Sequence, residues 1–199
     1  MPKEKSYHHG DLRSALIQAA RDIVEQKGPD DVSLRGVAQA AGVSRAAPYH
    51  HFEDKQALLA AVAAVGFQEL ADLMLSKIVS SAPARTQLDQ LGLGYVEYGI
   101  SNPLLFRLMQ GPAFQVPGIY PELDQARGAS ATPLINTVSA CLSGKSEQQI
   151  MTACAAAWSI VHGMAMLATD GRLQTLIDLT QLQTASFSIT SQLELLRED

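Results

Sequence analysis

The chain has 199 residues, of which 47% are hydrophobic, and carries a formal net charge of −5. This composition excludes a disordered chain, because enough apolar side chains are present to bury a core. The apolar residues are mainly alanine and leucine, with few β-branched runs, which favours helices over strands. We therefore expect an all-α protein.

The acidic excess lies in the second part of the chain. Residues 1–55 hold eight Lys or Arg against eight Asp or Glu, whereas residues 56–199 hold seven against twelve. A negative net charge argues only weakly against a nucleic-acid partner when the first part is neutral. If the first part binds DNA, few cations are available, so we expect a modest salt dependence.

Targeting and redox signals are sparse. The N-terminus does not show the basic, apolar and small-residue pattern of a signal peptide, so we expect a cytoplasmic protein. Cys141 and Cys154 lie in apolar helical contexts without zinc-ligand spacing. Reduced cysteines in the core are the favoured interpretation, and a disulfide is the alternative.

The first third of the chain predicts three helices. Gly10 and Asp11 can cap a first helix, whose apolar residues recur at spacings of three and four and which ends at Lys27 and Gly28. Ser33 can cap a second helix that Gly42 ends, and Ser44 a third. Two short helices joined by a glycine turn are typical of a helix-turn-helix, whose second helix enters the DNA major groove. Pro48 should make the first turn of that helix tight or irregular.

The remaining chain also predicts helices. A long fourth helix over residues 55–81 joins the two halves. Further helices are expected at 85–101, 103–110, 121–142, 146–169 and 176–196. Ser146 with Gln149 fits a capping box at the start of one of them.

A series of motif residues spans about the first 60 positions. In chain order they are Arg13 to Ala20, Gly28, Ser33-Leu34-Arg35, Ala41-Gly42-Val43-Ser44, Tyr49, His51-Phe52, Lys55 and Leu58-Leu59. Their order and spacing resemble the N-terminal domain of the TetR family of transcriptional repressors. The segment Ala157 to Gly163 is similar to the Trp-His-Gly segment of one C-terminal subgroup of that family.

The resemblance implies a helix-turn-helix DNA-binding domain over residues 1–60 and a helical ligand-binding and dimerisation domain over residues 61–199. It also implies a homodimer that binds a palindromic operator and is released by an unidentified small molecule. No cofactor is expected. Release would follow if the ligand tilted the fourth helix and changed the separation of the two recognition helices.

The resemblance also implies which residues contact DNA. The predicted set is Ser33, Arg35, Ser44, Arg45, Ala46, Ala47, Tyr49, His50 and Lys55. Arginine can bind the guanine edge with two hydrogen bonds, and the two alanines can touch thymine methyl groups. Ser44, Tyr49 and Lys55 suit phosphates. A solvated surface arginine is the alternative for Arg45.

Two positions set this chain apart from the usual family pattern. Pro48 stands where an apolar residue other than proline is common, and Arg45-Ala46-Ala47 replaces a stretch that often contains glycine. The operator sequence therefore cannot be transferred from a relative. The neighbouring His50 and His51 point about 100° apart on a helix and lack spaced acidic or cysteine ligands, so no metal site is expected.

The stretch from residue 148 to 169 has no formal charge and is long enough to cross a membrane. We favour a dimer interface over a membrane span, because Ala155, Ser159 and Gly163 share one helix face and allow close helix approach. The expected partner helix carries Leu179, Leu182, Phe187, Ile189, Leu193 and Leu196. Two such helices from each subunit would form a four-helix contact.

Aromatic and methionine side chains in the second part could line an apolar effector cavity. They are Tyr95, Tyr98, Phe106, Met109, Phe114, Trp158, His162 and Met166. Core packing is the alternative for each of them. The loop over residues 111–121, which contains three prolines, could control ligand entry.

Other function classes fit the sequence less well. Ser143-Gly144-Lys145-Ser146 imitates the end of a phosphate-binding loop, but Ser139 occupies the required glycine position and a helix precedes it. We therefore do not expect an enzyme. A helical ligand carrier without sequence-specific DNA binding, and a transcriptional activator, remain alternatives.

Overall fold

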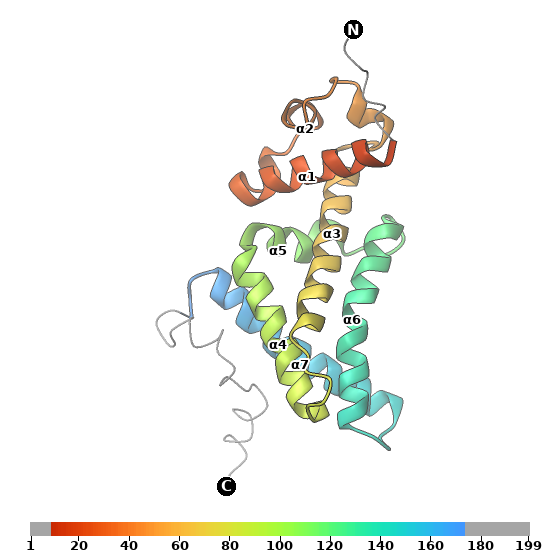
Figure 1. The fold of residues 1–199 in the computed structure, drawn as a ribbon, viewed down its shortest axis with the longest axis vertical. Helices are drawn as coiled ribbons and strands as arrows, with labels where there is room; N and C mark the ends of the chain where they lie inside the picture. The colour runs from red at the N-terminus through yellow and green to blue at the C-terminus, as the bar shows by residue number, and fades with distance from the viewer. Residues whose placement is uncertain (1–8, 174–199) are drawn as a thin grey trace. The chain divides into compact units, whose positions relative to one another are not determined.

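The computed structural model describes residues 9–173, which form α-helices and short 3₁₀ helices and contain no strand (Figure 1). The prediction of an all-α protein is confirmed. The described residues group into two compact units. Unit 1 combines residues up to Gly66 with Leu104–Gln125, and unit 2 combines Phe67–Pro103 with the residues from Ala126 onward. The predicted domain boundary at residue 60 stays a prediction.

Helix α1 (His9–Lys27) ends where the sequence predicts it, but Gly10 and Asp11 lie inside the helix, so the prediction that they cap its start is wrong. The helix ends because Gly28 adopts a φ of 90°, a left-handed conformation that costs glycine little. A short 3₁₀ helix, η1 (Pro29–Asp31), then leads to the next element.

Helix α2 (Leu34–Ala40) begins and ends through local hydrogen bonds. Ser33 is its N-cap, and the Ser33 hydroxyl accepts a hydrogen bond from the Gly36 amide at 3.1 Å. At the other end Gly42 has a φ of 67° and the Val43 amide donates to the Ala38 carbonyl at 3.0 Å. These bonds satisfy the free groups of the helix ends, as the sequence predicts.

The prediction of a third α-helix capped by Ser44 is wrong. The segment forms a 3₁₀ helix, η2 (Ala47–His50), whose N-cap is Ala46 and which has no side-chain cap. Proline has no amide hydrogen, so Pro48 cannot donate to the Ser44 carbonyl as an α-helix requires. The Ala47 amide donates to that carbonyl instead, at 3.0 Å, and the tighter geometry continues to residue 50.

Helix α3 (Lys55–Ser76) passes from unit 1 into unit 2. Asp54 caps its start, because its carboxylate accepts from the Ala57 amide at 2.8 Å. The predicted end at residue 81 is wrong by one turn. The Val79 amide donates to the Gln90 side chain at 3.0 Å instead of to a helical carbonyl.

Unit 2 contains α4 (Ala84–Ser101), most of α6 (Pro121–Cys141) and α7 (Glu147–Thr169), and α4 packs against α7 (Figure 1). The predicted capping box of Ser146 and Gln149 is present. Helix α3 approaches α4 closely, since a Cβ on Gly94 would lie 2.8 Å from the Met74 Cα. The helix predicted at 176–196 lies outside the described residues.

Unit 1 is completed by α5 (Pro103–Gln110), which starts at the boundary between the units, and by η3 (Pro112–Phe114). Leu105, Phe106 and Met109 of α5 are completely buried. The apolar side of this short helix therefore belongs to the core.

Candidate nucleic-acid interface and effector region

The recognition segment, defined here as Ser44–His50, exposes most of its polar side chains. Ser44, Arg45, Ala46 and His50 are exposed, and Tyr49 is 55% exposed despite its size. Residues three apart lie on the same side of a 3₁₀ helix, so Ala46 and Tyr49 share one face. The segment thus presents a guanidinium, an imidazole and a phenol to the surroundings.

Ala47 does not belong to this exposed set. Ala47 is only 9% exposed and is buried together with Pro48, which argues against a contact between Ala47 and a thymine methyl group. The 3₁₀ geometry turns these two side chains into the core of unit 1, and Ala46 keeps the exposed position.

Three further predicted DNA contacts lie close to η1 and α2. Arg35 is exposed in the first turn of α2, and Ser33 is exposed although its hydroxyl oxygen caps that helix. The Lys55 ammonium donates to the Asp30 carbonyl at 2.9 Å. An ammonium has three donor hydrogens, so this bond leaves Lys55 further donor capacity. The DNA-contacting roles of all these residues stay predictions.

One contact that sequence analysis missed joins three parts of unit 1. The Arg13 guanidinium lies 5.5 Å from the centre of the Phe52 ring, and its Nη2 lies 2.5 Å from Oε2 of Glu122. Arg13 and Glu122 are 109 positions apart. The sequence places Arg13 among the motif residues, but no residue near Arg13 in the sequence indicates that Glu122 of α6 is its partner.

His50 of the recognition segment and its neighbour His51 belong to no cluster of metal-ligating side chains in the part of the chain that the structure describes. Within residues 9–173, no group of three His, Cys, Asp or Glu side chains is arranged to hold a metal ion. His51 is half-buried, with its ring centre 6.4 Å from that of Phe52. His51 therefore takes part in packing, as does the buried Phe52.

Five of the predicted effector residues are buried. Tyr95, Tyr98, Phe106, Met109 and Phe114 have exposures of 6% or less. Phe106, Met109 and Phe114 belong to unit 1, whereas the two tyrosines belong to unit 2 together with Trp158, His162 and Met166. Core packing accounts for the buried side chains, and an effector role for any of the eight stays a prediction.

Tyr95, Trp158 and His162 form a hydrogen-bonded cluster between α4 and α7. The Trp158 indole donates to the Tyr95 hydroxyl oxygen at 3.2 Å, and this oxygen lies 2.9 Å from His162 Nδ1. Burial raises the pKa of Tyr95 to about 12, an effect that the Trp158 hydrogen bond partly opposes. Burial lowers the pKa of His162. Both shifts favour a neutral cluster, in which the phenol can donate to an unprotonated Nδ1.

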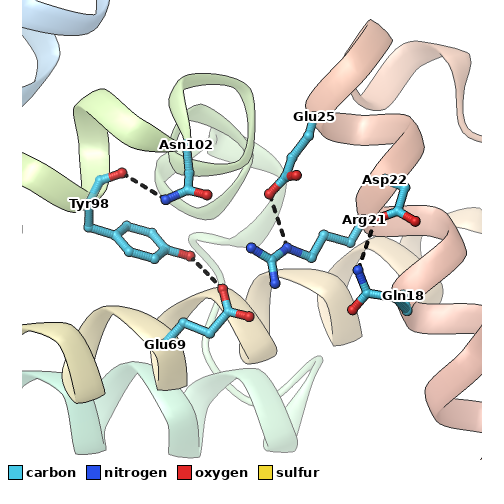
Figure 2. Close-up of polar contacts among 7 residues, drawn as sticks. All are labelled: Gln18, Arg21, Asp22, Glu25, Glu69, Tyr98 and Asn102. Atoms are coloured by element: carbon cyan, nitrogen blue, oxygen red, sulfur yellow. Dashed lines mark hydrogen bonds and ion pairs between the residues drawn. The ribbon is translucent and has the colours of Figure 1, made fainter.

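A second tyrosine of α4 bonds to α3. The Tyr98 hydroxyl donates to Glu69 Oε2 at 3.2 Å, and Asn102 donates to the Tyr98 carbonyl at 3.1 Å (Figure 2). Lys77, the residue after the end of α3, forms an ion pair at 2.6 Å with Glu97 of α4. Helix α4 is therefore bonded to α3 through Tyr98 and to α7 through Tyr95.

Helix α7 exposes an apolar face. Met151, Trp158 and Leu167 are each more than 40% exposed, and Ala155 and Ser159 are exposed between them. Among residues 9–173, α3 and α7 have the length and apolarity of a membrane span, and only 11% of the most apolar α7 window is buried. An open groove on α7, lined by Gln148, Gln149, Thr152, Ala153 and Ala156, adjoins this face.

The loop over residues 111–121 and the two cysteines are the last features for which the sequence makes a prediction. In the loop predicted to control ligand entry, the Phe114 and Tyr120 rings meet edge to face at 5.7 Å, and the Gly118 amide donates to Asp124. Cys141 and Cys154 are both free thiols, and burial raises the pKa of each. The loop's role stays a prediction.

Two family models match the chain. The model described as bacterial regulatory proteins of the tetR family matches residues 16–62, and a tetracyclin repressor-like C-terminal domain matches residues 88–188. The chain belongs to the TetR family. This family consists of DNA-binding transcriptional regulators, so the family prediction is confirmed and the chain is not grouped with enzymes.

Relatives of the TetR-family chain resemble it over different lengths. It is 40% identical to the HTH-type transcriptional repressor Rv1474c of Mycobacterium tuberculosis over 63 residues, which are 32% of this chain and 34% of that protein. It is 24% identical to the uncharacterized HTH-type transcriptional regulator YobS of Bacillus subtilis over 90% of both chains. The first match therefore covers only about a third of that repressor's length.

A solved structure resembles nearly the whole chain. It is a protein with unknown function from Rhodococcus sp. RHA1, with a TM-score of 0.77 and 33% identity. The match covers 92% of this chain and 95% of that one. The helical fold of this chain is thus similar to that of a solved structure over nearly its whole length.

Proposed function

We propose that the protein is a homodimeric TetR-family repressor that binds a palindromic operator and is released by a small molecule. The observation that carries this proposal is the exposed recognition segment, which presents Arg45, Tyr49 and His50 after the glycine turn of a helix-turn-helix. The name of the M. tuberculosis relative, which matches in this region, supports repression rather than activation.

Arg45 is the proposed base reader. A guanidinium can donate two hydrogen bonds to guanine, which contributes about 1–3 kcal/mol of discrimination against other bases. Arg45 is exposed in the turn that leads into η2, so no burial has to be reversed for it to reach a groove. Ser44, Tyr49 and Lys55 are proposed to contact phosphates, which set affinity and register.

The exposed face of α7 is the proposed dimer interface. Ala155 and Ser159 lie one turn apart on it, and Gly163 continues the row of small residues. Small side chains allow helices to approach closely, while Met151 and Trp158 supply apolar area. A soluble, cytoplasmic dimer would cover this face without a membrane.

The proposed effector binds in unit 2 and acts on DNA binding through α3. Trp158 and His162, which resemble the Trp-His-Gly segment of a TetR subgroup, lie at the α4–α7 contact, where both side chains bond to the Tyr95 hydroxyl. A tilt of α3 would alter the spacing of the two recognition segments. Couplings of this kind are typically about 1–3 kcal/mol.

Selection of bound fragments from a random DNA pool, followed by sequencing, tests this function. An enriched palindrome is expected, and it supplies the operator for later measurements. Absence of enrichment at low and moderate salt would contradict the proposal and favour a ligand-binding protein without sequence-specific DNA binding. Reporter expression with and without the regulator then separates repression from activation.

Two variants test the contact assignments. Arg45→Ala should relax base preference at one or two operator positions, whereas Lys55→Ala should weaken binding to all sequences and reduce the salt slope by about one. Equal losses on operator and random DNA for Arg45→Ala would contradict its assignment as a base reader.

A further inference from the structure

We propose that Arg13 is a positioning residue for DNA reading, because it connects Phe52, two residues after the recognition segment, to the first turn of α6. The proposal rests on the proposed function. Helix α3 continues from unit 1 into unit 2 and is one connection to the DNA-reading elements. Arg13 adds a second, through α6, which also continues into unit 2.

The recognition segment is anchored mainly at its end. Helix η2 has no side-chain cap at its start. At its end, the amides of His51 and Phe52 both donate to the Pro48 carbonyl, at 3.0 and 2.9 Å, and the Phe52 ring is 4% exposed. A displacement of Phe52 therefore moves the Pro48 carbonyl, and with it the backbone that orients Tyr49.

Arg13, on α1, contacts the Phe52 ring that fixes this end of the segment. Its guanidinium lies 5.5 Å from the centre of the Phe52 ring, within the range of a cation–π contact. Planarity allows the same guanidinium to stack on a ring and to meet a carboxylate with two nitrogens at once. Arg13 uses both capacities, since Nη1 and Nη2 lie 3.4 and 2.5 Å from the two oxygens of Glu122.

Glu122 brings α6 into this arrangement. It stands in the first turn of α6, where a carboxylate is favourable at the positive end of the helix. The same helix continues beyond Gln125 into unit 2 and ends at Cys141. A movement of α6 that withdraws Glu122 would thus loosen Arg13, and Arg13 would in turn loosen Phe52.

The charge of Arg13 distinguishes a positioning role from a direct contact with DNA. Arg13 is paired with a carboxylate, so its positive charge is largely compensated. If Arg13 acted on DNA only through its charge, removal of the Glu122 charge would strengthen binding to every sequence. A positioning role predicts the opposite for the operator.

The test measures dissociation constants of the full-length chain for its selected operator and for a random duplex, over a range of salt concentrations. Glu122→Gln and Arg13→Gln should each lower the operator-to-random affinity ratio about threefold to tenfold, the range of one or two weak contacts. The salt slope should stay unchanged. The double variant should lose no more than either single variant, because both break one connection.

Arg21→Gln is the matched control. Arg21 also lies on α1 and pairs with a glutamate, Glu25, at 3.0 Å within that helix (Figure 2). This variant removes the same charge without touching Phe52, so the ratio should stay at the wild-type value. Thermal unfolding of all variants verifies that unit 1 remains folded.

Three outcomes would overturn the proposal. Equal weakening on both DNAs with a reduced salt slope for Arg13→Gln would make Arg13 a phosphate contact. An unchanged ratio for Glu122→Gln would remove α6 from the arrangement. If the wild-type chain shows no operator preference, the proposed function fails as well, which distinguishes that result from the first two.

Discussion

Helices α3 and α7 are almost equally apolar but differ in their surroundings. Their most apolar windows have mean hydropathies of 1.7 and 1.6, yet 61% of the α3 window is buried and only 11% of the α7 window. The chain itself covers most of α3. Helix α7 is bonded to its own chain through Tyr95 but leaves Met151, Trp158 and Leu167 uncovered.

The difference between α3 and α7 means that apolar composition alone does not predict whether a helix is buried within its own chain or left exposed for association. Burial within the chain stabilises the monomer, whereas an uncovered apolar face gains stability only by association. Substitutions in α3 should therefore change folding, and substitutions on the exposed face of α7 should change assembly.

The largest expected effect is on folding through α3. Leu70 is 1% exposed, and Leu70→Ala should lower the free energy of unfolding by about 2–5 kcal/mol, since it removes buried methyl groups and leaves a cavity. Leu75 is 49% exposed on the same helix, so Leu75→Ala should cost under about 0.5 kcal/mol. Urea unfolding at one protein concentration measures both, and similar losses would refute the contrast.

Assembly should respond to a charge on the exposed face of α7. Ser159→Arg should raise the dimer dissociation constant about 100-fold, because an unpaired charge would enter an apolar interface. The helical circular dichroism spectrum should persist. Sedimentation equilibrium measures the constant, and Ala140→Arg, at an exposed alanine of α6, is the control that should leave it unchanged. An intact Ser159→Arg dimer would place the interface elsewhere.

A smaller effect on stability is expected at the contact between α7 and α4. Tyr95→Phe removes the hydroxyl that bonds to both Trp158 and His162, and should cost about 1 kcal/mol of stability. The chain has one tryptophan, so its fluorescence reports this contact directly. Tyr98→Phe breaks the bond to Glu69 instead and should leave the emission spectrum unchanged. Identical spectra for wild type and Tyr95→Phe would argue against the cluster in solution.

The smallest effect concerns pH. Burial lowers the pKa of His162 below its ordinary value of 6.5, so the unfolded chain binds a proton more readily than the folded one. Stability should therefore be complete above about pH 6.5 and fall as the pH decreases towards the folded-state pKa. Urea unfolding across this range should show a weaker pH dependence for His162→Gln. His50→Gln, at an exposed position, should follow the wild type; coincident profiles for all three would contradict this prediction.

Local signals correctly predicted several helix ends. Ser33 and Ser146 cap their helices through bonds to residues three positions on, and Gly28 and Gly42 end theirs with positive φ values. Each of these signals involves only a few neighbouring residues, so it can be recognised in the sequence without knowledge of the fold. The family prediction succeeded for a related reason, since the motif residues all lie within the first 60 positions.

Contacts between distant positions escaped prediction. The end of α3 depends on Gln90, which takes the Val79 amide, and the partner of Arg13 is 109 positions away. Periodicity also could not separate effector residues from core. Phe106 and Met109 are completely buried, while Trp158 is 47% exposed. Pro48 signalled an irregular turn, but the extent of the 3₁₀ helix depended on how Ala47 and Pro48 pack.

In the proposed DNA-bound dimer, the shortness of η2 would limit how much sequence information one subunit reads. With Ala47 and Pro48 buried, few side chains of the recognition segment remain to distinguish bases. Each well-read base pair contributes about 1–3 kcal/mol, and a genome offers on the order of 10⁶–10⁹ competing sites. One half-site would therefore recur by chance throughout a genome. In the proposed dimer, the distance and symmetry between two half-sites would carry the remaining information, so a change in spacer length should weaken operator binding more than a change in any single base.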